Sequence, residues 1–171
     1  YGNLCVVNST FNENELLSND DVITWGCGGA IYNKGELTIR ESTFSNNISR
    51  CDDSSGGAIL NNDGQLTIKK STFIKNHAYD DGAIGNNLGR LMITESIFRE
   101  NSANSGGVIS SADTLIITES EFIENSADYV LNNNSETELV HCRFRNNIAA
   151  KGLISRYQGD DLEISDCEFF D

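Results

Sequence analysis

Phenylalanine recurs seven times at one phase of an internal repeat, and this recurrence constrains the fold more than any other feature of the 171 residues. Successive members lie between 22 and 33 residues apart, and they are Phe11, Phe44, Phe73, Phe98, Phe122, Phe144 and Phe169. A repeat with a period of about 20 to 50 residues is typical of a solenoid, in which each repeat packs only on its neighbours. We therefore expect a stack of similar layers with these rings in its core.

The residues around each phenylalanine repeat with it and predict two short strands. Leu37-Thr38-Ile39 alternates apolar and polar side chains, as a strand with one buried face does. Ser42-Thr43-Phe44 predicts a second strand that points its small and large side chains inward. An asparagine follows three positions after phenylalanine, where we expect a corner, because asparagine tolerates the left-handed backbone and can hydrogen-bond along a stack. These asparagines are Asn14, Asn47, Asn76, Asn101, Asn125 and Asn147.

A third strand is predicted by the recurring Gly-Gly-Ala-Ile motif, as at residues 28–31 and 56–59. Three short strands per repeat without helical periodicity predict an all-β fold, a parallel β-helix solenoid of about seven rungs in one domain, residues 1–171. The period excludes a left-handed hexapeptide β-helix, and a leucine-rich repeat is a weaker alternative. Because the chain begins inside a predicted strand and shows no capping helix, we expect an excerpt of a longer repeat domain.

The composition narrows the classes of partner. A net charge of −14 argues against nucleic acid, because a phosphate-binding surface needs clustered lysine and arginine. No stretch is long and apolar enough to span a membrane, so we expect no direct insertion by this segment. Cations, basic proteins and neutral glycans remain open as partners. The alternative interpretation is that the acidic surface keeps a strand-rich molecule soluble.

The five cysteines fall into two groups and one single residue. Cys142 and Cys167 share the phase of the inward serines, so we expect stacked core residues with free thiols. Cys27 and Cys51 lie in two consecutive long segments on one side of adjacent rungs, which predicts a disulfide between them and an oxidising exterior. Cys5 has an outward phase and no assigned role.

The segment between the asparagine corner and the Gly-Gly strand varies in length, as binding loops on one face of a solenoid often do. It holds acidic pairs in three successive rungs, beside aromatic side chains. Calcium suits such carboxylates, and an aromatic ring beside them suits a sugar. The alternative is a solvated acidic face. The predicted ligand-binding residues are Trp25, Asp52, Asp53, Tyr79, Asp80 and Asp81, with calcium at Asp52, Asp53, Asp80 and Asp81.

Catalytic interpretations find less support in the sequence. The acidic pairs supply carboxylates for a polysaccharide hydrolase or lyase, but without a recognisable motif. Arg50 near Asp52 and Lys75 near Asp80 are the only basic residues placed to serve a lyase. His77 and His141 have no serine or cysteine partner by spacing. We therefore predict no catalytic residue and no required cofactor.

The paired motifs resemble repeats of known surface proteins. Gly28-Gly29-Ala30-Ile31 with Phe44-Ser45-Asn46-Asn47 resembles the repeat of chlamydial polymorphic outer-membrane proteins. The longer pattern from Asn33 to Asn47 is similar to adhesin-like surface proteins of methanogenic archaea and related bacterial proteins. The resemblance implies a right-handed parallel β-helix from a large exported protein at the cell surface, and it carries over no catalytic residue.

Three hypotheses follow for function. The first is a non-enzymatic extracellular adhesin segment that attaches to a host or neighbouring cell surface, a glycan or a surface protein through the predicted loops. The second is a polysaccharide-degrading lyase or hydrolase of the pectin-lyase-like β-helix class that uses the same acidic residues. The third is a passive stalk that only projects another domain.

Overall fold

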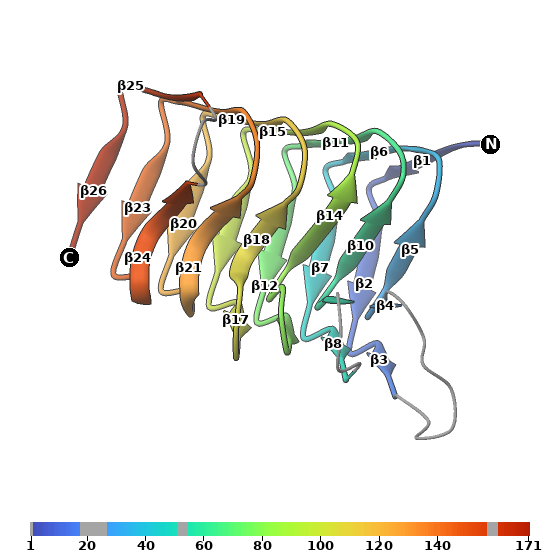
Figure 1. The fold of residues 1–171 in the computed structure, drawn as a ribbon. Coiled ribbons are helices and arrows are strands. Elements are labelled where there is room, and N and C mark those ends of the chain that lie inside the picture. Colours follow the sequence, from blue (N-terminus) through green and yellow to red (C-terminus); the bar gives the residue numbers. More distant parts are fainter. Residues whose placement is uncertain (1, 18–26, 51–54, 157–160) are drawn as a thin grey trace.

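Parallel strands stack rung upon rung along one axis in the computed structural model, which describes residues 2–17, 27–50, 55–156 and 161–171 (Figure 1). The first sheet has seven strands, one from each Leu-x-Ile unit. In spatial order they are β1 (Asn3–Val7), β6 (Glu36–Arg40), β11 (Leu66–Lys69), β15 (Leu91–Thr94), β19 (Leu115–Thr118), β22 (Thr137–Val140) and β25 (Leu162–Ser165). The all-β parallel stack confirms the predicted fold class.

The second sheet also has seven parallel strands, and each carries one phenylalanine of the series. They are β2 (Thr10–Asn12), β7 (Thr43–Ser45), β12 (Thr72–Ile74), β16 (Ile97–Arg99), β20 (Glu121–Ile123), β23 (Arg143–Arg145) and β26 (Glu168–Phe170). Neighbouring strands pair equivalent positions of the repeat, because Phe73 pairs with Phe44 on one side and with Phe98 on the other.

The third sheet differs from the prediction, because it holds two strands from most rungs. A short strand follows the asparagine corner in β3 (Glu15–Leu16), β8 (Ile48–Ser49), β13 (His77–Ala78) and β17 (Ser102–Ala103). The predicted Gly-Gly strand gives β5 (Ile31–Asn33), β10 (Ile59–Asn62), β14 (Ile84–Leu88) and β18 (Gly107–Ser111), whereas β4 (Cys27–Gly28) and β9 (Ser55–Gly56) form a separate two-stranded sheet. As the intervening segment shortens, both merge into β21 (Ser126–Asn133) and β24 (Ile148–Arg156).

The core is a column of aromatic rings flanked by aliphatic side chains. Successive phenylalanine rings are stacked, with centroids 4.6 to 5.0 Å apart and planes within 9° of parallel. This distance equals the spacing of neighbouring strands, about 4.8 Å, so each rung adds one ring to the column. Phe44, Phe73, Phe98 and Phe122 are fully buried.

The corner after each phenylalanine is built differently from the prediction. The residue with positive φ is the one before the asparagine that follows each phenylalanine by three positions, as in Lys75 (φ 54°) and Glu100 (φ 52°). The asparagine itself turns inward: Asn76 is fully buried, and its Nδ2 donates to Oδ1 of Asn101 at 2.9 Å. The predicted hydrogen bonding along the stack is confirmed. The left-handed backbone conformation lies one residue before the asparagine, because the asparagine side chain points inward to make these hydrogen bonds.

Ion pairs on the surface join neighbouring rungs throughout the described part of the chain. Lys69 Nζ lies 3.0 Å from a carboxylate oxygen of Glu95, and Arg143 Nε lies 2.8 Å from one of Glu168. Such exposed pairs each contribute about 0 to 1 kcal/mol, so they reinforce the register without determining it.

Candidate functional site

The structure describes three of the six residues that the sequence grouped as a ligand-binding surface, Tyr79, Asp80 and Asp81. Trp25, Asp52 and Asp53 lie outside the described residues. Tyr79 is 51% exposed beyond the end of β13, and Asp80 is half-buried beside it. Asp81 is only 6% exposed, so its side chain is packed within the stack and does not belong to an exposed contact surface.

Asp81 is a buried carboxyl group among glycines. A Cβ atom on Gly85 would approach Asp81 Oδ2 to 2.6 Å, and one on Gly106 would lie 3.4 Å from Oδ1. Burial raises the pKa of Asp81 to about 7, opposed by a hydrogen bond with Ser110 and reinforced by the charge of Asp80. A carboxyl group enclosed in this way is a structural element whose charge depends on pH.

The two basic residues that the sequence offered as weak support for a lyase form ion pairs with glutamates of neighbouring rungs. Lys75 Nζ lies 3.4 Å from Glu100, and Arg50 pairs with Glu15. Across residues 2–17, 27–50, 55–156 and 161–171, no three acidic, histidine or cysteine side chains form a metal-binding group. The calcium prediction therefore keeps only Asp80 and Asp81 within the described chain and stays a prediction.

The sequence interpretation of His77 was wrong, because it has a serine partner. Nδ1 of His77 lies 2.9 Å from Oγ of Ser102 and 3.1 Å from the carbonyl oxygen of the same residue. The two residues are 25 positions apart, which is one rung in this part of the stack. Spacing within a single motif could not find this contact, whereas the repeat period could.

The cysteines follow their predicted phases where the structure describes them. Cys142 and Cys167 are free thiols inside the stack, and Cys5 is a free exposed thiol. Cys27 is disulfide-bonded. Its predicted partner, Cys51, lies outside the described residues, so the pairing stays a prediction.

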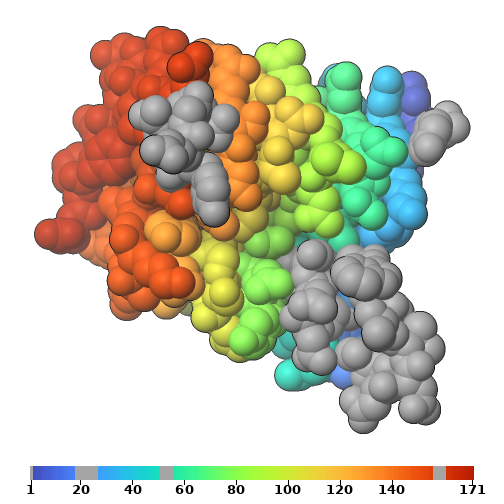
Figure 2. Space-filling model, viewed as in Figure 1, coloured from blue at the N-terminus to red at the C-terminus, as the bar shows by residue number. Residues whose placement is uncertain are grey.

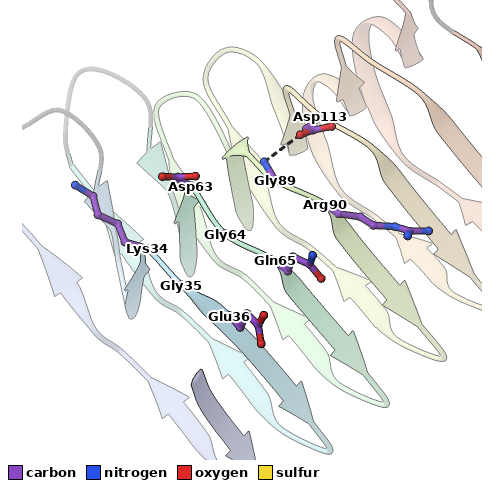
Figure 3. Close-up of a pocket in the computed structure, with 9 residues that line it drawn as sticks. All are labelled: Lys34, Gly35, Glu36, Asp63, Gly64, Gln65, Gly89, Arg90 and Asp113. Atoms are coloured by element: carbon purple, nitrogen blue, oxygen red, sulfur yellow. Dashed lines mark hydrogen bonds between the residues drawn. The ribbon is translucent and has the colours of Figure 1, made fainter. Parts of the chain in front are cut away.

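A furrow crosses four successive rungs at the turns that lead into the Leu-x-Ile strands. It encloses about 500 Å³ and lies where β5, β10, β14 and β18 turn into β6, β11, β15 and β19 (Figure 3). Its lining residues are Lys34, Gly35, Glu36, Asp63, Gly64, Gln65, Gly89, Arg90 and Asp113. The furrow therefore follows the axis of the stack.

Three glycines in one column form the floor of the furrow. A Cβ atom on Gly64 would lie 2.1 Å from the carbonyl oxygen of Gly35, and one on Gly89 would lie 1.9 Å from that of Gly64. Side chains are sterically excluded from this column, which leaves the floor open. The carbonyl oxygen of each glycine also accepts a hydrogen bond from an inward asparagine of the same turn, such as Asn61 to Gly64 at 2.8 Å.

Asp113 closes the furrow at the fourth rung, where the glycine column ends. Its Oδ2 accepts a hydrogen bond of 3.3 Å from the amide of Gly89, and its Oδ1 accepts one of 2.7 Å from the amide of Thr114 (Figure 3). Asp113 is thus fixed by backbone donors from its own rung and from the rung before. The furrow has a defined end on this side.

Charged and amide side chains line the two flanks of the furrow. Lys34 and Asp63 stand on one flank, and Glu36, Gln65 and Arg90 follow one another along the other (Figure 3). None of the ion pairs found in the described residues includes a furrow side chain, in contrast to most lysines elsewhere. The side chains of Asp63, Glu36, Gln65 and Arg90 are therefore available to a ligand, whereas the ammonium group of Lys34 lies over the ring of Tyr32.

An aromatic ring stands beside the first rung of the furrow. Tyr32 is 43% exposed, and Nζ of Lys34 lies 5.5 Å from the centre of its ring. The hydroxyl oxygen of Tyr32 accepts a hydrogen bond of 3.0 Å from Asn62, which is the main reason why its pKa is lowered. The ring is held in place from the next rung.

Sequence reasoning missed the furrow, although a signal for it exists. Gly35, Gly64 and Gly89 occupy one phase of the repeat, each followed by a charged or amide residue. Within a single repeat, each of these glycines is explained by a turn between two predicted strands. A column of glycines across rungs is a different signal, because it removes side chains along a line.

On the side seen in Figure 2, the described surface consists of bands that succeed one another in the order of the sequence, and each band contacts the bands before and after it. Among the described residues, no helix is long and apolar enough to cross a membrane.

A family model described as a right handed beta helix region matches residues 29–171. This match agrees with the expected hand of the solenoid. Comparisons with curated proteins and with solved structures gave no significant match.

Proposed function

Because the chain belongs to the right-handed β-helix family, we propose that it is a non-enzymatic adhesin segment that attaches to glycans along the furrow. Stacked turns of this fold make one continuous surface, and concave lines on such a surface suit extended ligands. In the proposal, the ligand chain runs parallel to the axis of the stack.

The observation that carries this proposal is the unpaired state of the furrow side chains. Elsewhere on the described surface, Lys69, Lys75 and Lys151 each pair with a carboxylate of a neighbouring rung. Within the part of the chain that the structure describes, Arg90 and Glu36 have no such partner, and they lie above a floor from which side chains are excluded. Polar groups that converge on an open concave line without satisfying one another favour a ligand that satisfies them.

The chemistry of the furrow fits sugar hydroxyl groups. The carboxylates of Glu36 and Asp63 accept hydrogen bonds from hydroxyls, the guanidinium of Arg90 donates them, and Gln65 does both. The face of Tyr32 offers an apolar platform for a sugar ring. Side chains recur once per rung, and a sugar unit of an extended chain advances by a similar length, so neighbouring units can meet equivalent positions.

Location at the cell surface rests on two supports. Cys27 is disulfide-bonded, and disulfides persist mainly in oxidising compartments outside the cytosol. The Gly-Gly-Ala-Ile and Phe-x-x-Asn motifs resemble those of adhesin-like surface proteins. We propose an exported protein that contacts a neighbouring cell or surface through its glycans.

A binding screen tests the proposal. The 171-residue protein is mixed with soluble polysaccharides of neutral, acidic and basic character, with calcium or with a chelator, and binding and product formation are followed by mass spectrometry. We expect binding without change of the polysaccharide. Cleaved or unsaturated products would support the lyase or hydrolase hypothesis, and no binding to any polysaccharide would support the stalk. Sensitivity to the chelator would locate a cation in the complex.

A further inference from the structure

One inward position changes chemistry along the stack, and this change is independent of the furrow. Two residues before each phenylalanine stands a serine in the first five rungs and a cysteine in the last two. In the serine rungs this hydroxyl is well fixed. Ser71 Oγ donates to the carbonyl of Lys69 at 2.9 Å and accepts from the amide of Ser42 at 3.2 Å.

The two cysteines keep this arrangement with longer contacts. Cys167 Sγ lies 3.3 Å from the carbonyl oxygen of Ser165, and Cys142 Sγ lies 3.4 Å from that of Ile117. The amide of Cys142 donates to Cys167 Sγ at 3.3 Å, so the second sulfur faces the backbone of the first cysteine. A thiol is a weak donor, and these contacts restrain the side-chain rotamers less than the hydroxyl contacts do.

The backbone around the pair meets the requirement for a disulfide. Val140 pairs with Ser165 and Arg143 pairs with Glu168, which sets Cys142 opposite Cys167 in neighbouring rungs. Neighbouring strands lie about 4.8 Å apart, and the Cα atoms of a disulfide lie about 4.4 to 6.8 Å apart. A rotation of the Cys142 side chain toward the next rung is the change needed to join the sulfurs.

Burial and the neighbouring Cys167 both affect the thiol of Cys142. Burial is the main cause that raises the pKa of Cys142 to about 11, and the charge and hydrogen bonding of Cys167 raise it further. Cys142 is fully buried, whereas Cys167 is half-buried. The more accessible Cys167 is therefore the sulfur that meets a reagent first.

We propose that Cys142 and Cys167 are a modification site that forms a rung-to-rung disulfide by exchange with a low-molecular-weight disulfide. The Cys167 thiolate attacks one sulfur of the reagent, forms a mixed disulfide and releases one small thiol. The sulfur of Cys142, after losing its proton, then attacks Cys167 and releases the second small thiol. The protein loses two electrons and two protons, and the reagent is reduced to two thiols.

The link would join the last two rungs covalently. The disulfide connects the turn between β22 and β23 to the turn between β25 and β26. In the described chain, β25 is the only strand of the first sheet after β22, and β26 is the only strand of the second sheet after β23. The oxidised state of Cys27 shows that a disulfide and these two thiols coexist in one chain. The pair therefore offers a bond that responds to the redox state without altering the furrow.

The test uses the full 171-residue chain with Cys5→Ser, because exposed Cys5 would otherwise form its own mixed disulfide. The protein is incubated with excess oxidised glutathione, quenched with acid, alkylated, digested and analysed by mass spectrometry. We expect peptides of Cys142 and Cys167 to be linked and the monomer to be lighter by two hydrogens. We also expect a thermal midpoint several degrees higher than that of the untreated protein.

Cys142→Ser in the same background is the matched control, because serine occupies this position in five rungs. We expect it to fold and to keep glutathione on Cys167, since no second sulfur resolves the mixed disulfide. Three results would overturn the proposal: alkylation of both cysteines after oxidation, a persistent glutathione adduct on Cys167 when Cys142 is present, or a link between two chains. None of these results bears on glycan binding.

Discussion

The side-chain amide of Asn76 donates a hydrogen bond of 2.9 Å to Oδ1 of Asn101, which stands at the same position one rung further along the stack. Oδ1 of Asn76 in turn accepts from the amide nitrogen of Asn47 and from its Nδ2, at 3.0 and 2.8 Å. Nδ2 of Asn76 also donates to the carbonyl of Phe44. One buried residue thereby satisfies polar groups of both adjacent rungs.

Asn76→Ala is expected to destabilise the protein by about 2 to 4 kcal/mol, because several buried polar groups lose their partner. Chemical denaturation followed by circular dichroism measures this free energy of unfolding. Asn104→Ala is the matched control, since Asn104 is exposed and makes no hydrogen bond through its side chain in the described structure. We expect the control to change stability by less than about 0.5 kcal/mol. Equal losses in both variants would refute the stabilising role of the asparagine stack.

Gly64→Ala is expected to cost about 1 to 3 kcal/mol and to disturb the furrow, because the added methyl group would meet the carbonyl oxygen of Gly35 at 2.1 Å. The same substitution at Gly2 meets no atom within 4 Å and should be neutral. Thermal unfolding of the two variants compares them directly. If Gly64→Ala is as stable as Gly2→Ala, the rungs are not packed closely along this column.

Asp81 gives the protein a pH dependence that a surface carboxylate would not give. Its pKa rises from 3.8 to about 7 on folding because the group is buried, so the folded protein retains a proton that the unfolded chain has released. The stability from this protonated group is complete below pH 3.8 and is lost as the pH rises through about 7. The total change is on the order of 4 kcal/mol.

Asp81→Asn removes this titration and keeps a neutral side chain of similar shape. We expect the variant to be more stable than the wild type at about pH 8, with a difference that shrinks toward about pH 4. Urea unfolding at several pH values measures the difference, and Asp161→Asn serves as an exposed control. A constant difference across this range would contradict a raised pKa for Asp81.

The periodic part of the fold could be predicted from the sequence, because every rung repeats the same contacts. The phase of Phe98 predicted its burial between Phe73 and Phe122, and the structure stacks the three rings at 4.8 and 5.0 Å. Even Thr137, which replaces leucine, keeps its place: it is buried and its hydroxyl accepts from Asn133 at 2.7 Å. The position of a residue within the repeat was therefore enough to predict that it lies in the core.

Contacts between rungs that do not follow the phenylalanine and asparagine phases were missed or misplaced. The contact of His77 with Ser102 and the glycine column of the furrow both join residues about one period apart, whereas motif reasoning compares residues close in sequence. Asp81 was expected on a ligand-binding surface because it belongs to the acidic pairs that lie in the variable segment of three successive rungs. Its burial follows from the close approach of Gly85 in the same rung and of Gly106 in the next rung.

Tyr79, which belongs to the loop surface that the sequence predicted, lies on a different side of the stack from the furrow. Tyr79 follows β13, which pairs with β8 and β17, and both of these strands lie on the lower side of Figure 1, whereas the furrow turns follow β5, β10 and β14 at the upper side. The furrow proposal predicts that Tyr79→Ala binds polysaccharide as the wild type does, while Tyr32→Ala loses about 1 kcal/mol of binding or more. Isothermal titration of both variants decides the point. A loss confined to Tyr79→Ala or Trp25→Ala would favour the loops.

The most direct test of glycan attachment through the furrow compares two arginine variants that differ only in place. Arg90→Ala removes an unpaired guanidinium from the furrow, and Arg99→Ala removes an exposed one from the second sheet. Their affinities for the polysaccharide that binds the wild type best are measured by titration, with circular dichroism to confirm the fold. The account predicts at least about a tenfold loss for Arg90→Ala and none for Arg99→Ala. Equal affinities in the two variants would contradict it.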